Sequence, residues 1–359
     1  MKVTEKSDNP ELDSQKITVQ KYGGATLSDP KKIRGVAKRI SESHSRGEKL
    51  IIVVSAMGKA TNSLIDLARA VSPTPPRREL DMLLSTGERI SMSLVSIALQ
   101  DFGCPAISFT GSQAGILTDE SHLNAFIQDI KPLRIQEALN ANKVVVLAGF
   151  QGVSPVSREI TTLGRGGSDT SAVAIASCFE GRCEILKDVP SVFTADPKIV
   201  PTAKPLATLK YSHLLNMAFW GAKVLHYRSV ELAMRKKVPL YIGPAHDSNL
   251  NENANSGTHV LPEETKMSYE STSVLAINSH SQVVKLNYPK TSSSEALSKF
   301  KTFVDEKQIG DPHILFISSD DGSSEIYVTG PDESIATIER QFEKQFDSSA
   351  LVPLSTVTL

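Results

Sequence analysis

The sequence predicts a three-layer α/β sandwich followed by a small α+β domain. Continuous apolar runs of strand length occur at residues 49–57, 105–111 and 143–152, with helix-like segments between them. Runs of this kind are typical of strands that are buried on both faces of a parallel sheet. Such strands alternate with helices in a layered α/β domain. A polar stretch at 244–265 then separates this pattern from a second group of elements.

Length and composition limit the function classes. A chain of 359 residues holds roughly two or three domains. Because 39 Lys and Arg nearly balance 40 Asp and Glu, the chain lacks the broad basic field of a nucleic-acid binder, and we expect no nucleic-acid partner. The cysteines at 104, 178 and 183 are scattered and not in metal-ligand spacing, which predicts free thiols within the core of a protein from a reducing compartment.

The N-terminal residues 1–15 are polar and charged. They offer too little apolar surface to offset the entropy of ordering, so we expect a disordered tail. No run in the sequence approaches the ~20 apolar residues that a membrane helix needs, and we expect a soluble, cytoplasmic protein without a membrane partner.

The first folded unit is a strand, a glycine turn and a helix. Residues 17–22 read as the strand, and 23–30 as the turn. Ser28 or Asp29 caps the helix, and Pro30 stands at its first position, where the missing N–H costs nothing. Four apolar residues then recur at helical spacing, namely Ile33, Val36, Ala37 and Ile40.

A long helix is predicted at 79–101. Its apolar residues are spaced for one buried face, which comprises Leu80, Leu83, Leu84, Ile90, Leu94 and Ile97. A strand at 183–188, a Pro-rich loop at 189–208, helices around 210–219 and 228–236, and a strand at 238–243 complete the sandwich.

The polar stretch 244–265 is predicted to be a surface loop that ends at the domain boundary. Beyond it, the elements suggest a small α+β domain with a βαββαβ-like order. The predicted strands and helices are 273–279, 282–288, 292–306, 313–318, 325–330, 333–346 and 351–359. This region has no cluster of catalytic residue types, so we place the chemistry within residues 17–260.

Two glycine turns are candidate anion sites, "KYGGAT" (21–26) and "GRGGSD" (164–169). The backbone N–H groups of such a turn and the following helix N-terminus bind anions, most often phosphate. Neither turn is a standard nucleotide motif. Asp169 would repel a pyrophosphate unless a cation intervened, which favours a site that combines phosphate, lysines and Mg²⁺. The alternative is a plain strand-to-helix connection.

The charged residues of these motifs fit phosphoryl transfer to a carboxylic acid. The set comprises Lys21, Arg165, Asp169, Asp188 and Lys223. Phosphoryl transfer needs cations around the γ-phosphoryl group and a fixed alignment of donor and acceptor. Arginine binds carboxylates in a bidentate manner, so Arg165 indicates that the second substrate is itself a carboxylic acid.

A series of motifs resembles the aspartokinases of the amino-acid kinase family. In order they are "KYGGAT", "VVSAMGKATN", "ELDMLLSTGERIS", "GFQG", "TTLGRGGSDTSAVA", "KDVPSVFTADPKIV" and "GAKVLH", within 17–260. The resemblance implies a sandwich of the amino-acid kinase type at 16–262 and an ACT-like, ferredoxin-like domain at 268–359. It implies transfer of phosphate from ATP to L-aspartate, giving 4-phospho-L-aspartate, the first step toward lysine, threonine and methionine.

The resemblance also implies roles for individual residues. Lys21 would stabilise the transferring phosphoryl group, and Asp169 would hold this lysine in place. No general base is needed, because the acceptor carboxylate is already ionised at neutral pH. Arg165 would bind the α-carboxylate of aspartate and Glu88 its ammonium group. The pocket would be lined by Ser55, Thr61, Phe150 and Ser168, for which helix caps (Ser55, Thr61) and core packing (Phe150) are the alternatives.

For ATP, the resemblance implies a larger set. Its members are Lys21, Gly23, Gly24, Lys187, Asp188, Phe193, Lys198, Lys223 and Val224. Mg²⁺ would bridge the phosphates and bind mainly through water and phosphate oxygens, because the motifs contain no carboxylate cage. We therefore name no protein ligand for the metal.

The sequence departs from the family pattern at a few positions. Ala25 lacks a hydroxyl that Thr26 could replace, Tyr227 stands where proline is usual, and Pro190-Ser191 replaces a frequent Asp-Gly. The C-terminal region has room for about one ACT module where two are usual. Because 287–297 contains no glycine, lost or altered feedback by a lysine or threonine effector is a hypothesis. The edge strands of this module favour a homodimer.

Three functions compete. The first is a working aspartokinase. The second is a kinase for glutamate or N-acetylglutamate, although Glu88 suits a free ammonium and argues against an N-acylated substrate. The third is a catalytically weak amino-acid sensor or regulatory subunit, motivated by Ala25 and Tyr227. The retained charges Lys21, Arg165, Asp169 and Lys223 argue against a sensor.

Overall fold

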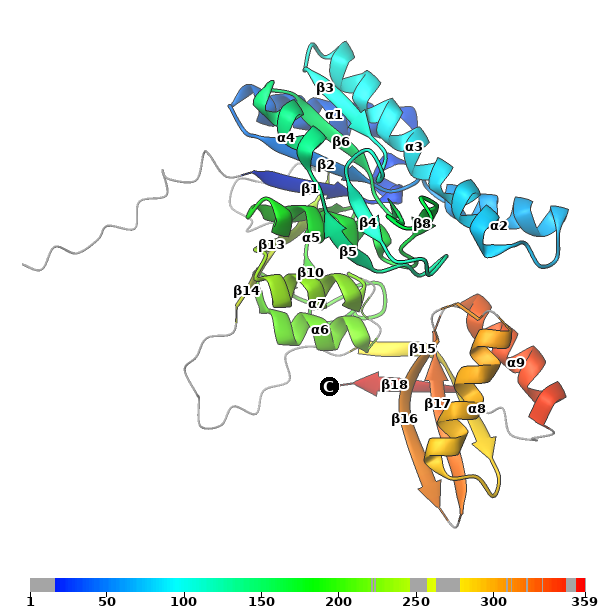
Figure 1. Cartoon of the computed structure of the whole chain (residues 1–359). Helices are drawn as coiled ribbons and strands as arrows, with labels where there is room; N and C mark the ends of the chain where they lie inside the picture. The colour runs from blue at the N-terminus through cyan, green and yellow to red at the C-terminus, as the bar shows by residue number, and fades with distance from the viewer. Residues whose placement is uncertain are drawn as a thin grey trace, which may run out of the picture. The chain divides into compact units, whose positions relative to one another are not determined.

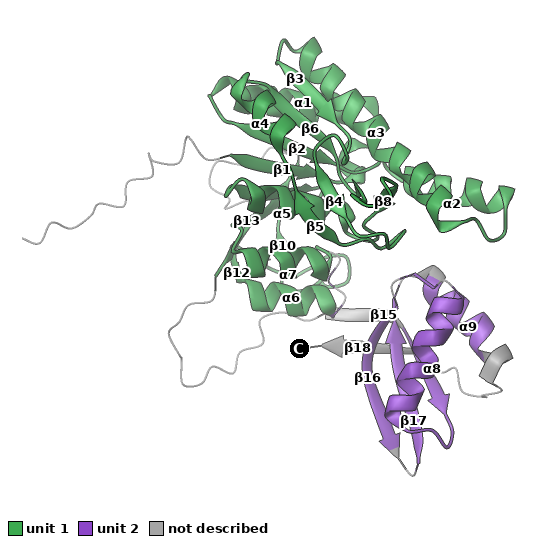
Figure 2. Ribbon diagram, viewed as in Figure 1, with its two compact units in different colours: residues 1–219, 223–270 green, residues 220–222, 271–359 purple. Residues whose placement is uncertain are grey.

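The computed structural model divides the chain into two compact units (Figures 1 and 2). They are residues 1–219 with 223–270, and residues 220–222 with 271–359. The structure describes residues 17–220, 222, 224–245, 257–262, 278–307, 309–310, 312–320, 322–330, 332–346 and 353–358. The predicted tail at 1–15, Lys223 and residues 273–277 of a predicted strand lie outside the described residues.

The first unit is built on an eight-stranded sheet with the order β12-β14-β13-β9-β1-β2-β6-β3. The six strands from β13 to β3 run parallel, and β14 runs antiparallel to β13. In chain order the strands are β1 Thr18–Tyr22, β2 Leu50–Val54, β3 Ala106–Phe109, β6 Val144–Ala148, β9 Arg182–Lys187, β12 Thr208–Lys210, β13 Leu240–Pro244 and β14 Thr258–Leu261. The three apolar runs of the sequence form β2, β3 and β6, as predicted.

Helices cover both faces of this sheet (Figure 1). On one face, α1 (Pro30–Ser45) and α3 (Arg77–Asp101) pack with alternate strand residues in a single core. On the other face, α5 (Gly167–Cys178) packs against β1, β2 and β9. The remaining helices are α2 Ala60–Val71, α4 Leu133–Asn140, α6 Tyr211–Phe219 and α7 Tyr227–Lys236. The three-layer α/β prediction is confirmed.

The start of α1 follows the predicted chemistry. Asp29 Oδ1 accepts a hydrogen bond from the Lys32 N–H at 3.0 Å, and Pro30 is the first helical residue. Asp29 satisfies one of the N–H groups that a helix N-terminus leaves free. This cap fixes where the glycine turn after β1 ends and the helix begins.

The predicted buried face of α3 is wrong for three of its residues. Ile90, Leu94 and Ile97 are 54%, 37% and 62% exposed. The buried side instead carries apolar residues together with small and polar ones, namely Asp81, Leu84, Ser85, Gly87, Glu88, Ser91, Met92, Val95, Ser96, Ala98 and Leu99. Hydrophobic spacing does not register a buried face that is partly polar. By length and composition α3 also qualifies as a membrane span, but 56% of its apolar window is buried in the fold, as in a core helix.

Several short strands were not predicted. A second sheet with the order β5-β4-β7-β8 is formed by β4 Ile116–Thr118, β5 Ile127–Ile130, β7 Gln151–Val153 and β8 Ile160–Thr162. The Pro-rich loop contains β10 (Val192–Phe193) and β11 (Pro205–Leu206), and β14 lies within the predicted surface loop at 244–265. Segments of two to four residues are too short to show a period, and their pairing partners are distant in the sequence.

The cysteines are free thiols, and they differ in burial. Cys104 and Cys183 are buried, whereas Cys178 is exposed, so the expectation that all three lie within the core is wrong for Cys178. This residue is the last one of α5, beyond the helix's buried run from Gly167 to Ala176.

The second unit has a βαββαβ order, and the predicted break between strands 273–279 and 282–288 is wrong, because Asn278–Tyr288 form one strand. Its elements are β15 Asn278–Tyr288, α8 Ser293–Glu306, β16 His313–Asp320, β17 Ser323–Thr329, α9 Asp332–Phe346 and β18 Pro353–Thr358. The sheet order β16-β17-β15-β18 is antiparallel throughout, which is a ferredoxin-like arrangement. Its core includes Leu286, Phe300, Phe303, Ile326 and Phe342.

Candidate functional site

The candidate site lies at the carboxyl ends of the parallel strands. Backbone hydrogen bonds join these ends closely: the Gly23 N–H donates to Leu186 O at 3.4 Å, and the Ser55 N–H donates to Tyr22 O at 3.2 Å. The Gly149 N–H donates to Val54 O at 3.1 Å. Open α/β sheets bind ligands at this edge. The segments after β1, β2, β6 and β9 therefore meet where a ligand is expected.

The first glycine turn requires glycine at position 24. A Cβ on Gly24 would lie 2.6 Å from Ala56 O, which is closer than contact distance. The turn continues as a short 3₁₀ helix, η2 (Gly24–Leu27). Within it, Thr26 is buried and its Oγ1 donates to Gly23 O at 2.6 Å. The Thr26 hydroxyl therefore stabilises the turn.

The second glycine turn leads directly into α5. Gly164 and Gly166 adopt left-handed backbone conformations with φ of +73° and +66°, which favour glycine. A Cβ on Gly166 would lie 2.1 Å from His226 Cβ. The first helical turn that follows carries Ser168 and Asp169, both buried. The turn thus presents a helix N-terminus and a carboxylate at the same place.

Lys21 and Asp169 form a buried ion pair across the β1–α5 interface. The Lys21 Nζ to Asp169 Oδ1 distance is 2.6 Å, and each side chain is 8% exposed. Burial opposes ionisation of Asp169, but the charges of Lys21 and Lys187 outweigh it and lower the pKa of this carboxyl. Asp169 is therefore an anion that orients cations and is unsuited to take up a proton.

Lys187 adds a second cation to this pair. It is the last residue of β9, and its Nζ donates to the backbone carbonyl of Val224. Burial and the neighbouring Lys21 lower its pKa, while Asp169 acts in the opposite direction. Asp188 also raises the pKa of Lys187, and Lys21 opposes the raised pKa of Glu88. The two ammonium groups would attract an anionic ligand to this place.

Glu88 presents an unsatisfied carboxylate oxygen. Its Oε1 accepts a hydrogen bond from the Ala56 N–H at 2.9 Å, whereas its buried Oε2 has no hydrogen-bond partner in the described part of the chain. Burial raises the pKa of Glu88 to about 7, against the opposing effect of the Ala56 N–H and Lys21. A buried oxygen of this kind is costly unless a ligand donor satisfies it.

The other predicted substrate residues lie on the same segments. Ser168 is buried beside Gly149, on which a Cβ would lie 2.9 Å from Ser168 Cβ. Phe150 has a φ of +68°, and its ring packs against Gly167. Arg165 is exposed on the second glycine turn.

Ser55 and Thr61 are half-buried. The alternative that they cap a helix is wrong, because α2 begins at Ala60 after Lys59 and has no side-chain cap.

The predicted ATP residues divide into two groups. Lys21, Gly23 and Gly24 lie at the end of β1 and in the turn that follows it, and Lys187 at the end of β9 donates to the carbonyl of Val224. Asp188 and Lys198 are exposed, and Phe193 is half-buried in β10. No hydrogen bond or ion pair between described residues joins Lys198 to the Lys21–Asp169 pair.

A buried polar network was missed from the sequence. Asp81 on α3 is fully buried and accepts from Thr162 Oγ1 at 2.5 Å and from the Leu123 N–H at 3.1 Å. His122 Nδ1 lies 2.5 Å from its other oxygen. Burial raises the pKa of Asp81, against the opposing effect of Thr162 and His122. The sequence did contain one indication. Asp81 stands two helical turns before Glu88 in the motif "ELDMLLSTGERIS", so both carboxylates are expected on the same face of the helix.

Among the described residues, no group of three or more His, Cys, Asp or Glu side chains could hold a metal ion. The buried carboxylate at the site, Asp169, is engaged by Lys21. These carboxylates are compatible with a divalent cation that takes its ligands mainly from phosphate oxygens and water.

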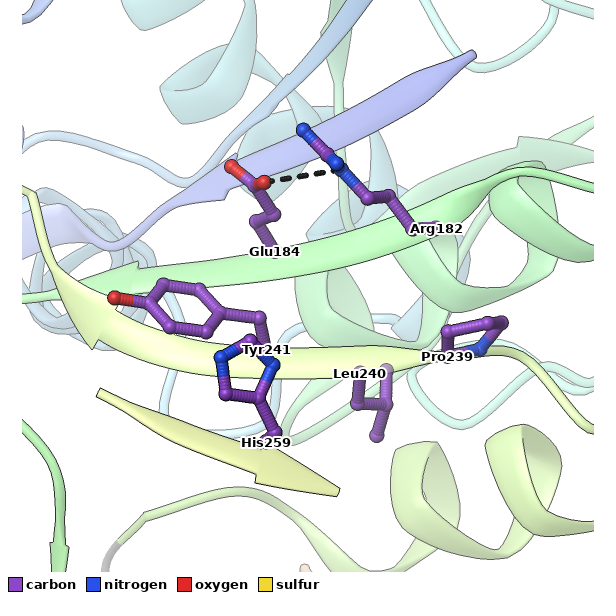
Figure 3. Close-up of a pocket in the computed structure, with 6 residues that line it drawn as sticks. All are labelled: Arg182, Glu184, Pro239, Leu240, Tyr241 and His259. Carbon is purple, nitrogen blue, oxygen red and sulfur yellow. Dashed lines mark ion pairs between the residues drawn. The ribbon is translucent and has the colours of Figure 1, made fainter. Parts of the chain in front are cut away.

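A surface hollow lies elsewhere on the large sheet (Figure 3). It encloses about 210 Å³ and is lined by Arg182, Glu184, Pro239, Leu240, Tyr241 and His259. Arg182 begins β9 and Lys187 ends it, so the two positions are roughly 16 Å apart along the strand. None of the predicted site residues lines this hollow.

The comparisons with known sequences point to one family. The model of the amino acid kinase family matches residues 16–244. The aspartokinase of Mycolicibacterium smegmatis is 53% identical over 63% of this chain and 54% of its own length. The Corynebacterium glutamicum aspartokinase is 43% identical over 88% of this chain and 74% of its own length. The chain thus spans about half the length of the first relative and three quarters of the second.

Solved structures agree. Aspartate kinase from Synechocystis is 36% identical with a TM-score of 0.60, covering 95% of this chain and 58% of its own. Escherichia coli aspartokinase III, in complex with aspartate and ADP, has a TM-score of 0.73 over 95% of this chain and 85% of its own. At 20% identity the latter likeness concerns the fold. The chain belongs to the amino acid kinase family, among the aspartokinases.

Proposed function

We propose that the protein is an aspartate kinase, which transfers the γ-phosphoryl group of ATP to the side-chain carboxylate of L-aspartate. The observation that carries this proposal is the buried cluster of Lys21, Asp169 and Lys187 at the carboxyl ends of β1 and β9. It lies between two glycine turns that offer N–H groups to phosphate. The aspartokinase relatives support aspartate as the acceptor.

The reaction needs positioning and positive charge more than proton transfer. An oxygen of the aspartate side chain attacks the γ-phosphorus, the bond from phosphorus to the β,γ-bridging oxygen breaks, and ADP leaves with that electron pair. The acceptor is ionised at neutral pH, so no residue needs to remove a proton. Lys21 and Lys187 offset the charge that builds on the phosphoryl and leaving oxygens, and Asp169 keeps Lys21 aimed at them.

Substrate choice follows from two charged side chains. Glu88, through its unsatisfied Oε2, pairs with the ammonium of aspartate, and Arg165 binds its α-carboxylate. The pocket is completed by Ser55, Thr61, Phe150 and Ser168. An N-acylated acceptor such as N-acetylglutamate would leave Glu88 buried without a cation, which is unfavourable.

The nucleotide is held by the remaining predicted residues. Lys187 and Val224 lie at the cluster, and Gly23 and Gly24 supply backbone groups. Asp188, Phe193, Lys198 and Lys223 complete the proposed set. Mg²⁺ bound to the phosphates would neutralise charge on the triphosphate and would be held mainly by phosphate and water oxygens.

The two compact units receive separate roles. We assign catalysis to residues 16–262 and an ACT-like regulatory or dimerising role to residues 268–359, whose ferredoxin-like strand order supports the assignment. Escherichia coli aspartokinase III has been solved in complex with lysine and aspartate. A lysine or threonine effector, a homodimer and a cytoplasmic location are proposals for this chain.

The test of the activity is ATP-dependent formation of aspartyl hydroxamate, in which hydroxylamine traps the acyl phosphate. Aspartate, glutamate and N-acetylglutamate serve as acceptors for the wild type and for Lys21→Ala. We expect turnover with aspartate alone and its loss in the variant. Binding of ATP without turnover of any acceptor would instead support a sensor subunit.

Feedback control needs a separate measurement on the same assay. Lysine, threonine and their mixture are titrated against the wild type, and we expect weak or absent inhibition because residues 287–297 contain no glycine. Cooperative inhibition at low effector concentration would show that the C-terminal unit retains an effector site.

A further inference from the structure

The second glycine turn packs against a loop formed by residues 119–126. This loop belongs to none of the aspartokinase-like motifs. A Cβ on Gly164 would lie 2.9 Å from Leu123 O and 3.1 Å from Asn124 Oδ1, so the loop packs directly on the turn. The Ala125 N–H also donates to Thr162 O at 2.9 Å. The residue that follows Gly164 is Arg165.

Asp81 holds this loop and the strand that precedes the turn at the same time. One carboxylate, fully buried, accepts from Thr162 Oγ1 on β8 and from the Leu123 N–H, and it contacts His122. Hydrogen bonds to a charged, buried acceptor are among the stronger ones in proteins. Leu123 adopts a φ of +70°, a conformation that a leucine rarely takes unless its surroundings impose it.

Arg228 on α7 also connects the loop 119–126 to the second glycine turn. Its guanidinium donates to Asn124 Oδ1 at 2.9 Å, to Leu163 O at 2.7 Å and to Ala125 O at 2.8 Å. It also stacks over the Phe126 ring at 4.4 Å from the centroid. The planar guanidinium of arginine can donate hydrogen bonds to several acceptors in fixed directions, whereas the ammonium of lysine is a compact point charge. The loop and the turn are therefore joined by one side chain.

We infer that Asp81 and Arg228 are positioning residues for Arg165, and that they fix where the carboxylate of the acceptor binds. The inference rests on the proposed function, in which Arg165 is the carboxylate clamp. Neither residue touches the reacting atoms. Both act on the segment between β8 and α5, which is also held by the Leu163 N–H donating to Phe150 O at 2.9 Å and the Gly167 N–H donating to Gly164 O at 3.0 Å.

The test separates the aspartate side of the site from the ATP side. Asp81→Asn keeps the shape of the side chain and removes its charge. Arg228→Lys keeps the positive charge and removes the planar guanidinium that makes the three hydrogen bonds. In the hydroxamate assay we expect the KM for aspartate to rise about tenfold to 100-fold, while the KM for ATP and the Kd for ADP stay within about twofold. Glu159→Gln, at a half-exposed carboxylate just before β8 that pairs with Arg78, is the matched control and should change neither constant.

A double-mutant cycle checks that the effect passes through Arg165. In an Arg165→Lys background, Asp81→Asn should change the KM for aspartate by less than about twofold, because the clamp that it positions is already lost. Additive effects, or an equal rise of the aspartate and ATP constants, would overturn the inference. If Asp81→Asn does not fold, Thr162→Val removes one donor to the same carboxylate and takes its place. A wild type without aspartate turnover would refute the proposed function instead.

Discussion

Lys21 Nζ lies 2.6 Å from Asp169 Oδ1, and both side chains are buried. The pair joins β1 to the first turn of α5, so it couples the two glycine turns. Breaking a buried ion pair by removing one partner costs about 3–5 kcal/mol, because the other charge remains without compensation. Removing Lys21 also removes a cation from the site, and removing Asp169 takes away the carboxylate that orients this cation.

We therefore predict that Lys21→Met and Asp169→Asn both lower kcat by at least about 100-fold. Asp169→Asn should do so equally at all pH values near neutrality, because Asp169 orients Lys21 and transfers no proton. Hydroxamate assays across pH, with thermal unfolding alongside, measure both effects. The control is Lys49→Met, at an exposed lysine before β2. A loss in Asp169→Asn that appeared only on one side of a pH transition would point to a general base.

Glu88 should make folding stability depend on pH. Burial raises its pKa to about 7 from the ordinary 4.5, so between these values the folded protein holds a proton that the unfolded chain has lost. Stability then falls as pH rises through this window and levels off above it. The shift corresponds to roughly 3 kcal/mol in the ligand-free protein. Glu88→Gln should flatten this slope in denaturant titrations, whereas Glu137→Gln, at an exposed position of α4, should leave it unchanged.

Glu88 should also control how aspartate binding depends on pH. The substrate ammonium pairs with the ionised carboxylate, so the KM for aspartate should fall as pH rises through about 7. Glu88→Gln should raise this KM and remove its pH dependence, with the KM for ATP unchanged. A pH-independent KM in the wild type would contradict the assignment.

Gly166 should be intolerant of any side chain for two reasons that can be separated. A Cβ there meets His226 at 2.1 Å, and the backbone φ is +66°. Gly103 has a similar φ of +73° and open space around its Cβ position. We expect Gly103→Ala to cost about 1–2 kcal/mol from the backbone alone, and Gly166→Ala to cost a further 1–3 kcal/mol or so from the clash and to abolish turnover. Equal unfolding free energies for the two variants would show that His226 moves aside and relieves the clash.

The buried face of α3 seen in the structure can be tested with two substitutions on this helix. Leu99 is fully buried, whereas Ile97 is 62% exposed. Leu99→Ala should destabilise the protein by about 2–5 kcal/mol, and Ile97→Ala by less than about 0.5 kcal/mol. Chemical denaturation of the two variants measures the difference. A large loss for Ile97→Ala would mean that another surface covers this face in solution.

The large elements could be predicted because their signals are local. β2 and β6 read as continuous apolar runs, and α1 begins at the capped proline that the sequence indicated. Lys21 and Asp169 stood in glycine turns whose chemistry restricts the ligand, and the structure places them in contact. The order of elements in the second unit followed from alternating strand and helix patterns in the same way.

The remaining features depend on contacts between distant residues. Asp81 and Thr162 are 81 positions apart, and no local sequence pattern around either residue predicts their hydrogen bond. The buried face of α3 carries Ser85, Glu88 and Ser91 because the site and the second sheet lie against it, so its apolar spacing was misleading. Strands of three residues such as β7 and β8 exist only through their partners.

The opposite orientations of Lys21 and Tyr22 make the first strand intolerant of slippage. Tyr22 is fully buried in the core with α1 and α3, while its neighbour in sequence points toward α5. Shifting β1 by one residue against β2 and β9 would bring the phenol toward Asp169 and the ammonium into the apolar core. An insertion or deletion within Thr18–Tyr22 would therefore break the Lys21–Asp169 pair and disrupt the core together, so the register of β1 against its neighbours fixes the position of both side chains.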